Sequence, residues 1–440
     1  MKYIYGLSKS GQSIINYLNS INERFFCWDD NVKIRKSLKI NKNYELVEPR
    51  NLNWNLITES FVSPGISFNN KKLDFLKNKN IKLYRDLEFY GRLANEKKII
   101  AITGTNGKST TTKLISDILN FNKIDNFVGG NLSPPLLDFV TSINEKNMHV
   151  IELSSFQLES FKSFKPTISI LLNISSDHLE RYDNFSDYIK QKEKIFNFKK
   201  SSFNIISVDT SETRKIFNKN KDKFIPISQD VLKKGIFLKN GFITDNYFEN
   251  NKVIFLDSIS ASLYGAFNSE NILAAYAVVK ILKLNIENFI KVIKNFRGLP
   301  HRLERVFKND YFEIINNSKA TNLDSAIKSI NEYKNISLIL GGKSKGKNFS
   351  EILKYKNNIK QIFLIGESQL NIFDQLNDNI KCHICNNLTS AVKKIFQNIN
   401  KSKNYKTILF SPGCSSFDQF RNYEERGVLF KKLINKYLDE

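Results

Sequence analysis

One short segment of the chain gathers the residue types that bind the phosphates of a nucleotide. An apolar run, Ile99–Ile102, leads into a glycine-containing loop and then into a stretch of helical character, Thr111–Leu119. The loop consists of Gly104, Thr105, Asn106, Gly107, Lys108, Ser109 and Thr110. In such a loop glycines let backbone N–H groups turn toward phosphate oxygens, a lysine reaches the β- and γ-phosphates, and a serine hydroxyl can ligate Mg²⁺. We therefore predict a phosphate loop, although Ile102 stands where the strict pattern has its first glycine.

Further polar side chains follow other expected strands. Glu152 comes directly after Met148–Ile151, and His178 lies just past Ile168–Leu172. A carboxylate at the tip of a strand beside a phosphate loop is well placed for Mg²⁺. On residue types alone, Glu152 could also be a solvated strand end and His178 a capping or packing residue. A predicted helix over Tyr188–Phe198 favours a solvated face, because it carries three lysines, Lys190, Lys192 and Lys194.

The elements that must position these residues follow a repeated order of strand, turn and helix. Further strands are expected at Lys2–Tyr5, Phe25–Trp28, Leu56–Val62, Ser337–Leu340, Gln361–Ile365 and Thr407–Phe410. This order is typical of parallel α/β sheets, which bind ligands at the carboxyl ends of their strands. Breaks near Gly91–Lys98 and at Gly298-Leu299-Pro300 predict three α/β domains. They are a Rossmann-like domain 1–91, a central phosphate-loop domain 92–297 with a mostly parallel sheet, and a third domain 298–440.

The turn after the first strand leaves two interpretations open. It has the sequence GLSKSG from Gly6 to Gly11, which is not the full G-x-G-x-x-G pattern of dinucleotide-binding turns. A simple strand–helix turn and a cradle for a nucleotide diphosphate are equally compatible with it.

The net charge of +23 raises the question of a nucleic-acid partner, because polyanions bind clustered cations. The excess is spread evenly, with 15 Lys and Arg against 9 Asp and Glu in residues 1–91, 29 against 21 in 92–297, and 23 against 14 in 298–440. A basic tail or arm is absent from the sequence. This distribution argues against a nucleic-acid-binding protein.

Other compositional features indicate an ordinary globular protein. With 41% hydrophobic and 25% charged residues, the chain is not wholly disordered. Cys382 and Cys385 form a lone C-x-x-C pair, for which we expect reduced thiols. No secretory leader pattern and no run of about 20 apolar residues is present, so we expect a cytoplasmic protein.

Seven motifs in a fixed order make the chain similar to the Mur ligases. They are GTNGKST, ELSSFQLE, NISSDHLERY, GAFNSENILAA, LPHRLE, NNSKATN and SPGCSSFDQFRNYEERG. The resemblance covers essentially all 440 residues and implies a UDP-binding domain, a central ATPase domain and a C-terminal Rossmann-like domain. The combination of the last three motifs resembles the branch of this family that adds D-glutamate.

The resemblance also implies roles for individual residues at the reaction centre. Lys108 and Ser109 would bind the phosphates of ATP and a first Mg²⁺, with Glu152 on the same ion. His178 would help to bind a second Mg²⁺. Lys192 would be the lysine that the family carries as a carbamate, which is an anionic oxygen ligand. Lys108, His178 and Lys192 are therefore the implied catalytic residues.

The same resemblance assigns residues to each substrate. Beyond the phosphate loop, ATP would contact Asn268, Asn271, Arg302 and Asn317. The UDP-linked substrate would contact Ser8, Lys9, Ser10, Asp29, Asp30, Ser63, Pro64, Gly65 and Asn131. D-glutamate would contact Lys319, Thr321, Lys345, Ser416 and Tyr423. Asn317 departs from the family pattern, which has an aspartate at this position.

The activity implied by the resemblance is an ATP-driven ligation. D-glutamate would be joined to UDP-N-acetylmuramoyl-L-alanine through an acyl phosphate, by a monomeric cytoplasmic enzyme that needs neither nucleic acid nor membrane insertion. One alternative is a ligase similar to folylpolyglutamate synthase, against which the separate N-terminal unit argues. A nucleic-acid-binding P-loop ATPase is the other alternative, and the even spread of charge argues against it.

Overall fold

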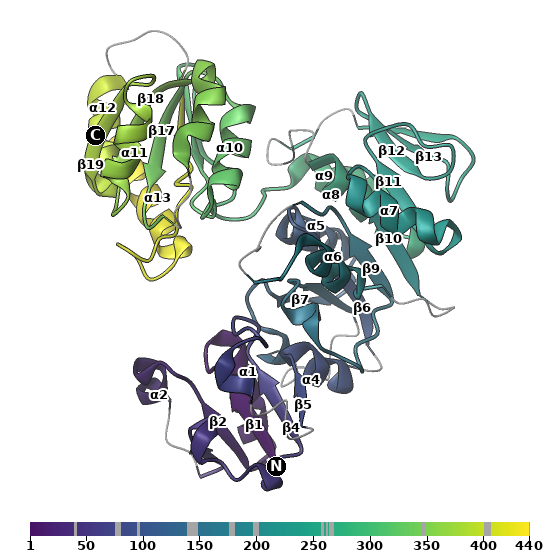
Figure 1. Ribbon diagram of the computed structural model, residues 1–440. Coiled ribbons are helices and arrows are strands. Elements are labelled where there is room, and N and C mark those ends of the chain that lie inside the picture. The colour runs from purple at the N-terminus through teal and green to yellow at the C-terminus, as the bar shows by residue number, and fades with distance from the viewer. Residues whose placement is uncertain are drawn as a thin grey trace. The chain divides into compact units, whose positions relative to one another are not determined.

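The strands form three sheets, which is the α/β architecture that the sequence predicts (Figure 1). The computed structural model describes residues 1–38, 42–74, 81–94, 97–138, 148–175, 181–196, 202–256, 259–260, 263, 268–344, 348–399 and 406–439. The first two sheets lie in one compact unit and the third in a second unit. The domain boundaries given above stay a prediction. No helix in the described ranges is long and apolar enough to cross a membrane.

The first sheet has five parallel strands in the order β3-β2-β1-β4-β5. The predictions for β1 and β2 are confirmed, but the strand expected from Leu56 begins at Glu59. Trp54–Leu56 instead forms a short 3-10 turn, because the Asn53 side chain accepts the backbone N–H of Asn55. The elements are β1 (Lys2–Tyr5), α1 (Lys9–Ser20), β2 (Phe25–Trp28), α2 (Val32–Ser37), β3 (Tyr44–Leu46), β4 (Glu59–Val62), β5 (Lys82–Tyr84) and α4 (Asp86–Leu93).

The second sheet has nine strands in the order β14-β13-β12-β11-β10-β9-β6-β8-β7. Its pairs are parallel except for β12–β13 and β13–β14. The strands are β6 (Lys98–Thr103), β7 (Asn126–Gly130), β8 (Met148–Glu152), β9 (Ile168–Leu171), β10 (Phe203–Ser207), β11 (Ile225–Ser228), β12 (Ile236–Lys239), β13 (Phe242–Asp245) and β14 (Lys252–Phe255). The helices are α5 (Lys108–Phe121), α6 (Phe185–Glu193), α7 (Ser211–Lys219), α8 (Ser269–Ile281) and α9 (Ile286–Asn295).

Helix α6 differs from the helix predicted over Tyr188–Phe198. It begins three residues earlier, because the Asn184 side chain caps it by accepting the backbone N–H of Asp187. It ends at Glu193, and residues 197–198 lie outside the described residues.

The first two sheets share one hydrophobic core. Ile4 and Phe61 of the first sheet, Leu87 of α4, and Ala101 and Ile151 of the second sheet belong to one cluster of buried side chains. Because this core is continuous, it fixes the loops of both sheets within a single unit.

The third sheet has six strands in the order β15-β16-β20-β17-β18-β19 and carries helices on both faces (Figure 1). Side chains alternate along each strand, so Leu338 packs with α10 and α11 whereas its neighbour Ile339 packs with α12 and α13. The elements are β15 (Glu304–Lys308), β16 (Phe312–Asn316), α10 (Leu323–Glu332), β17 (Ile336–Gly341), β18 (Ile359–Ile365), α11 (Gln369–Leu376), β19 (Cys382–Asn386), α12 (Leu388–Ile399), β20 (Lys406–Phe410) and α13 (Tyr423–Asp439).

Candidate active site

The phosphate-loop segment lies between β6 and α5, as the sequence predicts. β6 pairs in parallel with β8 and β9, so three strand ends meet beside the loop. Gly107 has a φ of +83°, in the left-handed region, and a Cβ there would overlap the side-chain oxygen of Asn271. Lys108 is the first residue of α5, and the N-terminus of a helix favours an anion. The local backbone therefore has the features of a phosphate cradle.

Two lysine side chains from different helices meet on one carbonyl of this loop. The Nζ of Lys108 donates to the carbonyl oxygens of Gly104 and Thr105 at 2.8 and 2.9 Å. The Nζ of Lys192 donates to the same Gly104 oxygen at 2.8 Å, and this residue is only 2% exposed. The amines of two lysines from different helices thus converge on one carbonyl of the loop.

The orientation of α6 decides which of its lysines reaches the loop. Lys190 and Lys194 are exposed, whereas Lys192 is buried. Tyr188, one turn before Lys192, is also buried, and its hydroxyl lies 3.0 Å from the Thr105 Oγ1. The solvated face that the lysine-rich pattern favours is therefore correct for Lys190 and Lys194 and wrong for Lys192.

A partly buried chain of hydrogen bonds fixes the middle of the loop. The Asn173 Oδ1 accepts the backbone N–H of Asn106 at 2.9 Å, and its Nδ2 donates to Glu270 at 2.7 Å. The Ser207 hydroxyl donates to the other Glu270 oxygen at 3.0 Å. The sequence analysis assigned no role to Asn173 or Glu270. The available signal was that Asn173 is the first polar residue after a buried strand that neighbours the loop.

Two asparagines predicted to contact ATP, Asn268 and Asn271, meet at the start of α8. The Asn271 Nδ2 donates to the Asn268 Oδ1 at 2.7 Å, and both residues are buried. The Thr111 hydroxyl of α5 donates to the Asn271 Oδ1 at 2.9 Å. These bonds join α8 to the helix that begins at the phosphate loop.

The oxygen donors predicted for Mg²⁺ lie at the ends of β8 and α5. Ser109 is buried in the first turn of α5, and Glu152 ends β8. The Asn131 Nδ2 donates to the Glu152 Oε1 at 2.6 Å, which orients the carboxylate. One hydroxyl and one carboxylate fit Mg²⁺, which commonly binds through one or two carboxylates together with substrate phosphates. His178 lies outside the described residues, within which no group of three or more His, Cys, Asp or Glu forms a metal cluster.

Apart from Asn131, which follows β7 of the second sheet, the residues predicted for the UDP-linked substrate lie directly after β1, β2 and β4. These strands are neighbours, so their carboxyl ends share one edge of the first sheet. The Oγ atoms of Ser8 and Ser63 lie 3.5 Å apart, which brings the turns after β1 and β4 together. Lys9 and Ser10 begin α1 directly after the first of these turns, and Pro64 and Gly65 lie in the second.

The two aspartates after β2 differ in their surroundings. The Asp29 carboxylate is engaged by the backbone, since it accepts the N–H groups of Leu7 at 2.7 Å and Asn31 at 2.8 Å. Partial burial raises the pKa of Asp30, but hydrogen bonds from Lys72 and Tyr5 outweigh this effect and leave that pKa lowered. Asp29 thus orders the turn after β1, and Asp30 is an exposed anion beside it.

The residues predicted in the third sheet follow β16 and β20, which are parallel neighbours. The Lys319 Nζ lies 5.5 Å from the centre of the Tyr423 ring, and the Lys319 backbone N–H donates to the carbonyl of His301, beside Arg302. Lys345 lies outside the described residues. Thr321 and Ser416 lie in the segments that follow these two strands.

Asn317 uses the amide that distinguishes it from the family's aspartate. Its Nδ2 donates to the Ser411 Oγ at 3.1 Å, and its Oδ1 accepts the Leu303 backbone N–H at 3.3 Å. A carboxylate could accept the second bond but could not donate the first. Asparagine at position 317 therefore donates a hydrogen bond to Ser411 that an aspartate could not donate.

Arg426 is a buried charge that the sequence analysis missed. Its guanidinium donates to the hydroxyl and carbonyl of Ser318 at 3.1 and 2.8 Å and to the carbonyl of Cys414 at 3.2 Å. Burial lowers the pKa of Arg426 to about 10, so it stays charged near neutral pH. It joins the loops after β16 and β20.

Replacing Gly107 by alanine is expected to weaken nucleotide binding at least about tenfold, since the new Cβ requires a strained backbone and displaces Asn271. Titration with fluorescent ADP measures this effect. Gly65→Ala is the matched control, because a Cβ at Gly65 meets no atom within 4 Å. Equal ADP affinity in Gly107→Ala and the unmodified protein would contradict the phosphate-loop assignment.

The stability of the second unit is expected to fall with falling pH because of His301. Burial lowers the pKa of this imidazole, although Glu304 opposes the shift, and the Asn316 Nδ2 lies 2.9 Å from its Nδ1. In the unfolded chain the His301 imidazole takes up a proton at its ordinary pKa of about 6.5, whereas in the folded protein it does so only at a lower pH. Neutral His301 therefore contributes stability above about pH 6.5, and this contribution is lost as the pH falls through the pKa of the folded state. In thermal unfolding, His301→Gln should lose less stability between about pH 7 and pH 5 than the unmodified protein. Equal losses of stability in the variant and the unmodified protein would contradict this role of His301.

The chain is similar in sequence to known proteins of one family. The model of the Mur ligase middle domain matches residues 102–279. The UDP-N-acetylmuramoylalanine--D-glutamate ligase of Rickettsia bellii (strain RML369-C) is 37% identical, over 98% of this chain and 96% of its own length. The protein of the same name from Clostridioides difficile (strain 630) is 34% identical, over 98% of this chain and 97% of its own.

Solved structures share the fold. The UDP-N-acetylmuramate-alanine ligase MurC of Thermotoga maritima matches with a TM-score of 0.60 at 17% identity, covering 100% of this chain and 99% of that chain. The MurF ligase of the same species, in complex with ADP, matches with a TM-score of 0.60 at 14% identity, covering 99% and 95%. At these identities the likeness concerns the fold alone. The identity to curated relatives along nearly the whole chain shows the family: the chain belongs to the UDP-N-acetylmuramoylalanine–D-glutamate ligases among the Mur ligases.

Proposed function

We propose that this enzyme uses ATP to join D-glutamate to UDP-N-acetylmuramoyl-L-alanine, a step in the synthesis of peptidoglycan precursors. The observation that carries the proposal is the convergence of Lys108 and Lys192 on the Gly104 carbonyl. A site for phosphoryl transfer needs groups that neutralise and position the phosphates. Lys108 would neutralise phosphate charge, and Lys192, as a carbamate, would help to hold Mg²⁺ beside it. The choice of substrates is supported by the names of the curated relatives.

The proposed chemistry starts from a carboxylate, which is a poor acyl donor. Transfer of the γ-phosphoryl group of ATP converts the free carboxylate of the UDP-linked substrate into an acyl phosphate and releases ADP. The amine of D-glutamate then attacks the acyl carbon, a proton leaves the nitrogen, and inorganic phosphate departs as the amide forms. The chain's part is to bind and orient the reactants and to neutralise charge on the phosphoryl group.

Residues of the phosphate loop have distinct parts in this scheme. Lys108 turns from the loop carbonyls to the β- and γ-phosphates when ATP binds, and the N-terminus of α5 faces the phosphate oxygens. Ser109 and Glu152, together with His178 and carbamylated Lys192, would bind Mg²⁺. The metal supplies further neutralisation of phosphate charge.

The remaining assignments complete the proposal. Asn268, Asn271, Arg302 and Asn317 contact the nucleotide. Asn131 and the turns of the first sheet bind the UDP-linked substrate. Lys319, Thr321, Lys345, Ser416 and Tyr423 bind D-glutamate. We further propose that the enzyme is a monomer and works in the cytoplasm, where cells keep these nucleotide substrates.

The deciding experiment measures ADP release with UDP-N-acetylmuramoyl-L-alanine and either D- or L-glutamate. We expect turnover only when the UDP-linked substrate and D-glutamate are both present. Turnover with L-glutamate at the same rate would contradict the assignment. Turnover with a folate substrate would indicate the folylpolyglutamate-type ligase, and ADP release stimulated by DNA or RNA would indicate the nucleic-acid-dependent ATPase.

A further inference from the structure

A buried ionic cluster lies where the first and second sheets of the same unit meet. Arg85, between β5 and α4, is 0% exposed and forms an ion pair with Glu159 through its Nη2, while its Nε donates to the same oxygen at 3.1 Å. Arg181 donates to the two carboxylate oxygens of Glu159 at 3.1 and 2.9 Å. We call Arg85, Glu159 and Arg181 the arginine cluster. It contains two guanidinium groups and one carboxylate.

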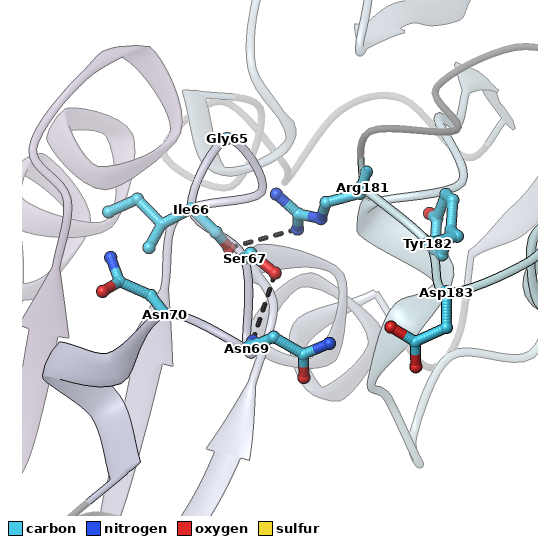
Figure 2. Close-up of a pocket in the computed structure, with 8 residues that line it drawn as sticks. All are labelled: Gly65, Ile66, Ser67, Asn69, Asn70, Arg181, Tyr182 and Asp183. Atoms are coloured by element: carbon cyan, nitrogen blue, oxygen red, sulfur yellow. Dashed lines mark hydrogen bonds between the residues drawn. The ribbon is translucent and has the colours of Figure 1, made fainter.

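The arginine cluster directs its remaining donors to the turn after β4. Both guanidinium groups donate to main-chain carbonyls there, at distances between 2.8 and 3.1 Å. The accepting carbonyls belong to Val62, Ser63, Pro64 and Ile66. Figure 2 shows the guanidinium of Arg181 reaching across to the backbone at Ile66. Charged donors thus fix most carbonyls of a short turn from one side.

Aromatic rings restrict the two guanidinium groups further. The guanidinium carbon of Arg85 lies 3.6 Å from the centre of the Phe68 ring, and that of Arg181 lies 4.5 Å from the centre of the Phe156 ring. A planar guanidinium stacked on a ring offers its donors in fixed directions. Burial lowers the pKa of Arg85 to about 10, which leaves the group charged near neutral pH.

The contacts of the carbonyls also set the directions of the N–H groups in the turn. In a trans peptide the carbonyl and the following N–H point in opposite directions. Because the carbonyls of Pro64 and Ile66 point at Arg181, the N–H groups of Gly65 and Ser67 point away from it. These residues line a pocket of about 540 Å³, with further walls from Ile66, Asn69, Asn70, Arg181, Tyr182 and Asp183 (Figure 2).

We propose that the arginine cluster is a positioning group for the UDP-linked substrate. It holds the turn of Ser63, Pro64 and Gly65 in the form that binds this substrate, without touching the substrate through Arg85 or Glu159. The inference rests on the proposed function, in which this turn contacts the UDP-linked substrate. A cluster that only joined the two sheets would affect stability and leave substrate affinity unchanged.

The test compares Arg85→Lys with the unmodified enzyme. Lysine keeps the charge, but a single ammonium cannot reach the Glu159 carboxylate and two carbonyls in the guanidinium's planar arrangement. We expect the KM for UDP-N-acetylmuramoyl-L-alanine to rise about tenfold, while kcat and the KM for ATP stay within about twofold. Glu159→Gln removes the shared charge with little change of size and should shift the same KM.

A matched control lies on the neighbouring helix. Arg92 of α4 forms ion pairs with Glu59 and Glu88 and is one-third exposed, and neither pair contacts the turn. Arg92→Lys should leave all three kinetic constants unchanged. Fluorescent ADP titration of each variant reports whether the phosphate loop is intact.

The possible outcomes separate this inference from the function on which it rests. If the unmodified enzyme releases no ADP with UDP-N-acetylmuramoyl-L-alanine and D-glutamate, the proposed function itself is wrong. If it does, and if Arg85→Lys or Glu159→Gln binds ADP normally with unchanged KM for the UDP-linked substrate, the positioning role is wrong. An equal rise in both KM values would also overturn it. Should Arg85→Lys fail to bind ADP, Glu159→Gln alone decides the question.

Discussion

Replacing Lys108 by alanine is expected to abolish ADP formation, with a fall in kcat of about a thousandfold or more. The reason is electrostatic, since phosphoryl transfer depends on groups that neutralise charge on the moving phosphoryl, and Lys108 begins α5 beside the loop carbonyls. Steady-state ADP release with saturating substrates measures the effect. Normal turnover by Lys108→Ala would show that the phosphate-loop assignment is wrong.

The control for Lys108 is Lys113, which lies on the same helix. Its side chain is 40% exposed and forms an ion pair with Asp117 one turn further along α5. Lys113→Ala therefore removes one positive charge from α5 without touching the loop, and its turnover should equal that of the unmodified enzyme. A similar loss in both variants would mean that the general charge of α5, and not the position of Lys108, is responsible.

Loss of Lys192 is expected to have the second-largest effect, a fall in kcat of about a hundredfold or more. Lys192 is buried against the loop, and we propose that its neutral amine reacts with CO₂ to form a carbamate. A C–N bond forms, one proton leaves, and the side chain becomes an anionic oxygen ligand. Lys192→Arg keeps a cation at this position but cannot form the carbamate, so both Lys192→Arg and Lys192→Gln should be inactive.

Two measurements separate the carbamate from a simple hydrogen-bonding role. With ¹³C-labelled bicarbonate, a carbamate signal should appear in the ¹³C NMR spectrum of the unmodified enzyme and be absent from both Lys192 variants. Lys190→Ala, at an exposed position of α6, should keep both the signal and the activity. Near-normal activity in Lys192→Arg would mean that the amine matters only as a cation that donates to the Gly104 carbonyl.

Local patterns in the sequence located several strands and the loops that end them, but strands such as β3, β7 and the antiparallel β13 were not predicted. The apolar runs at Lys2–Tyr5 and Phe25–Trp28 are strands with the predicted bounds, and the glycine pattern before Lys108 marks the loop between β6 and α5. Predictions failed at element ends, as at Glu59, where an asparagine cap competes with the apolar pattern. Such side-chain caps are single hydrogen bonds that periodicity does not record.

The sequence by itself determined the family, through seven motifs in a fixed order along the chain, and the strand, loop and helix around Lys108. Each of these motifs depends on residue types within a few positions of one another. The resemblance singled out Lys192, and the tertiary structure showed that this side chain is buried against the Gly104 carbonyl. Only the tertiary structure decided that Arg85 reaches both Ser63 and Glu159. Which face of a helix is buried, and which charge meets which carbonyl, depend on packing between segments that are far apart in the chain. Hydrophobic periodicity says that a segment buries one face, but the partner that covers this face is set by the whole core.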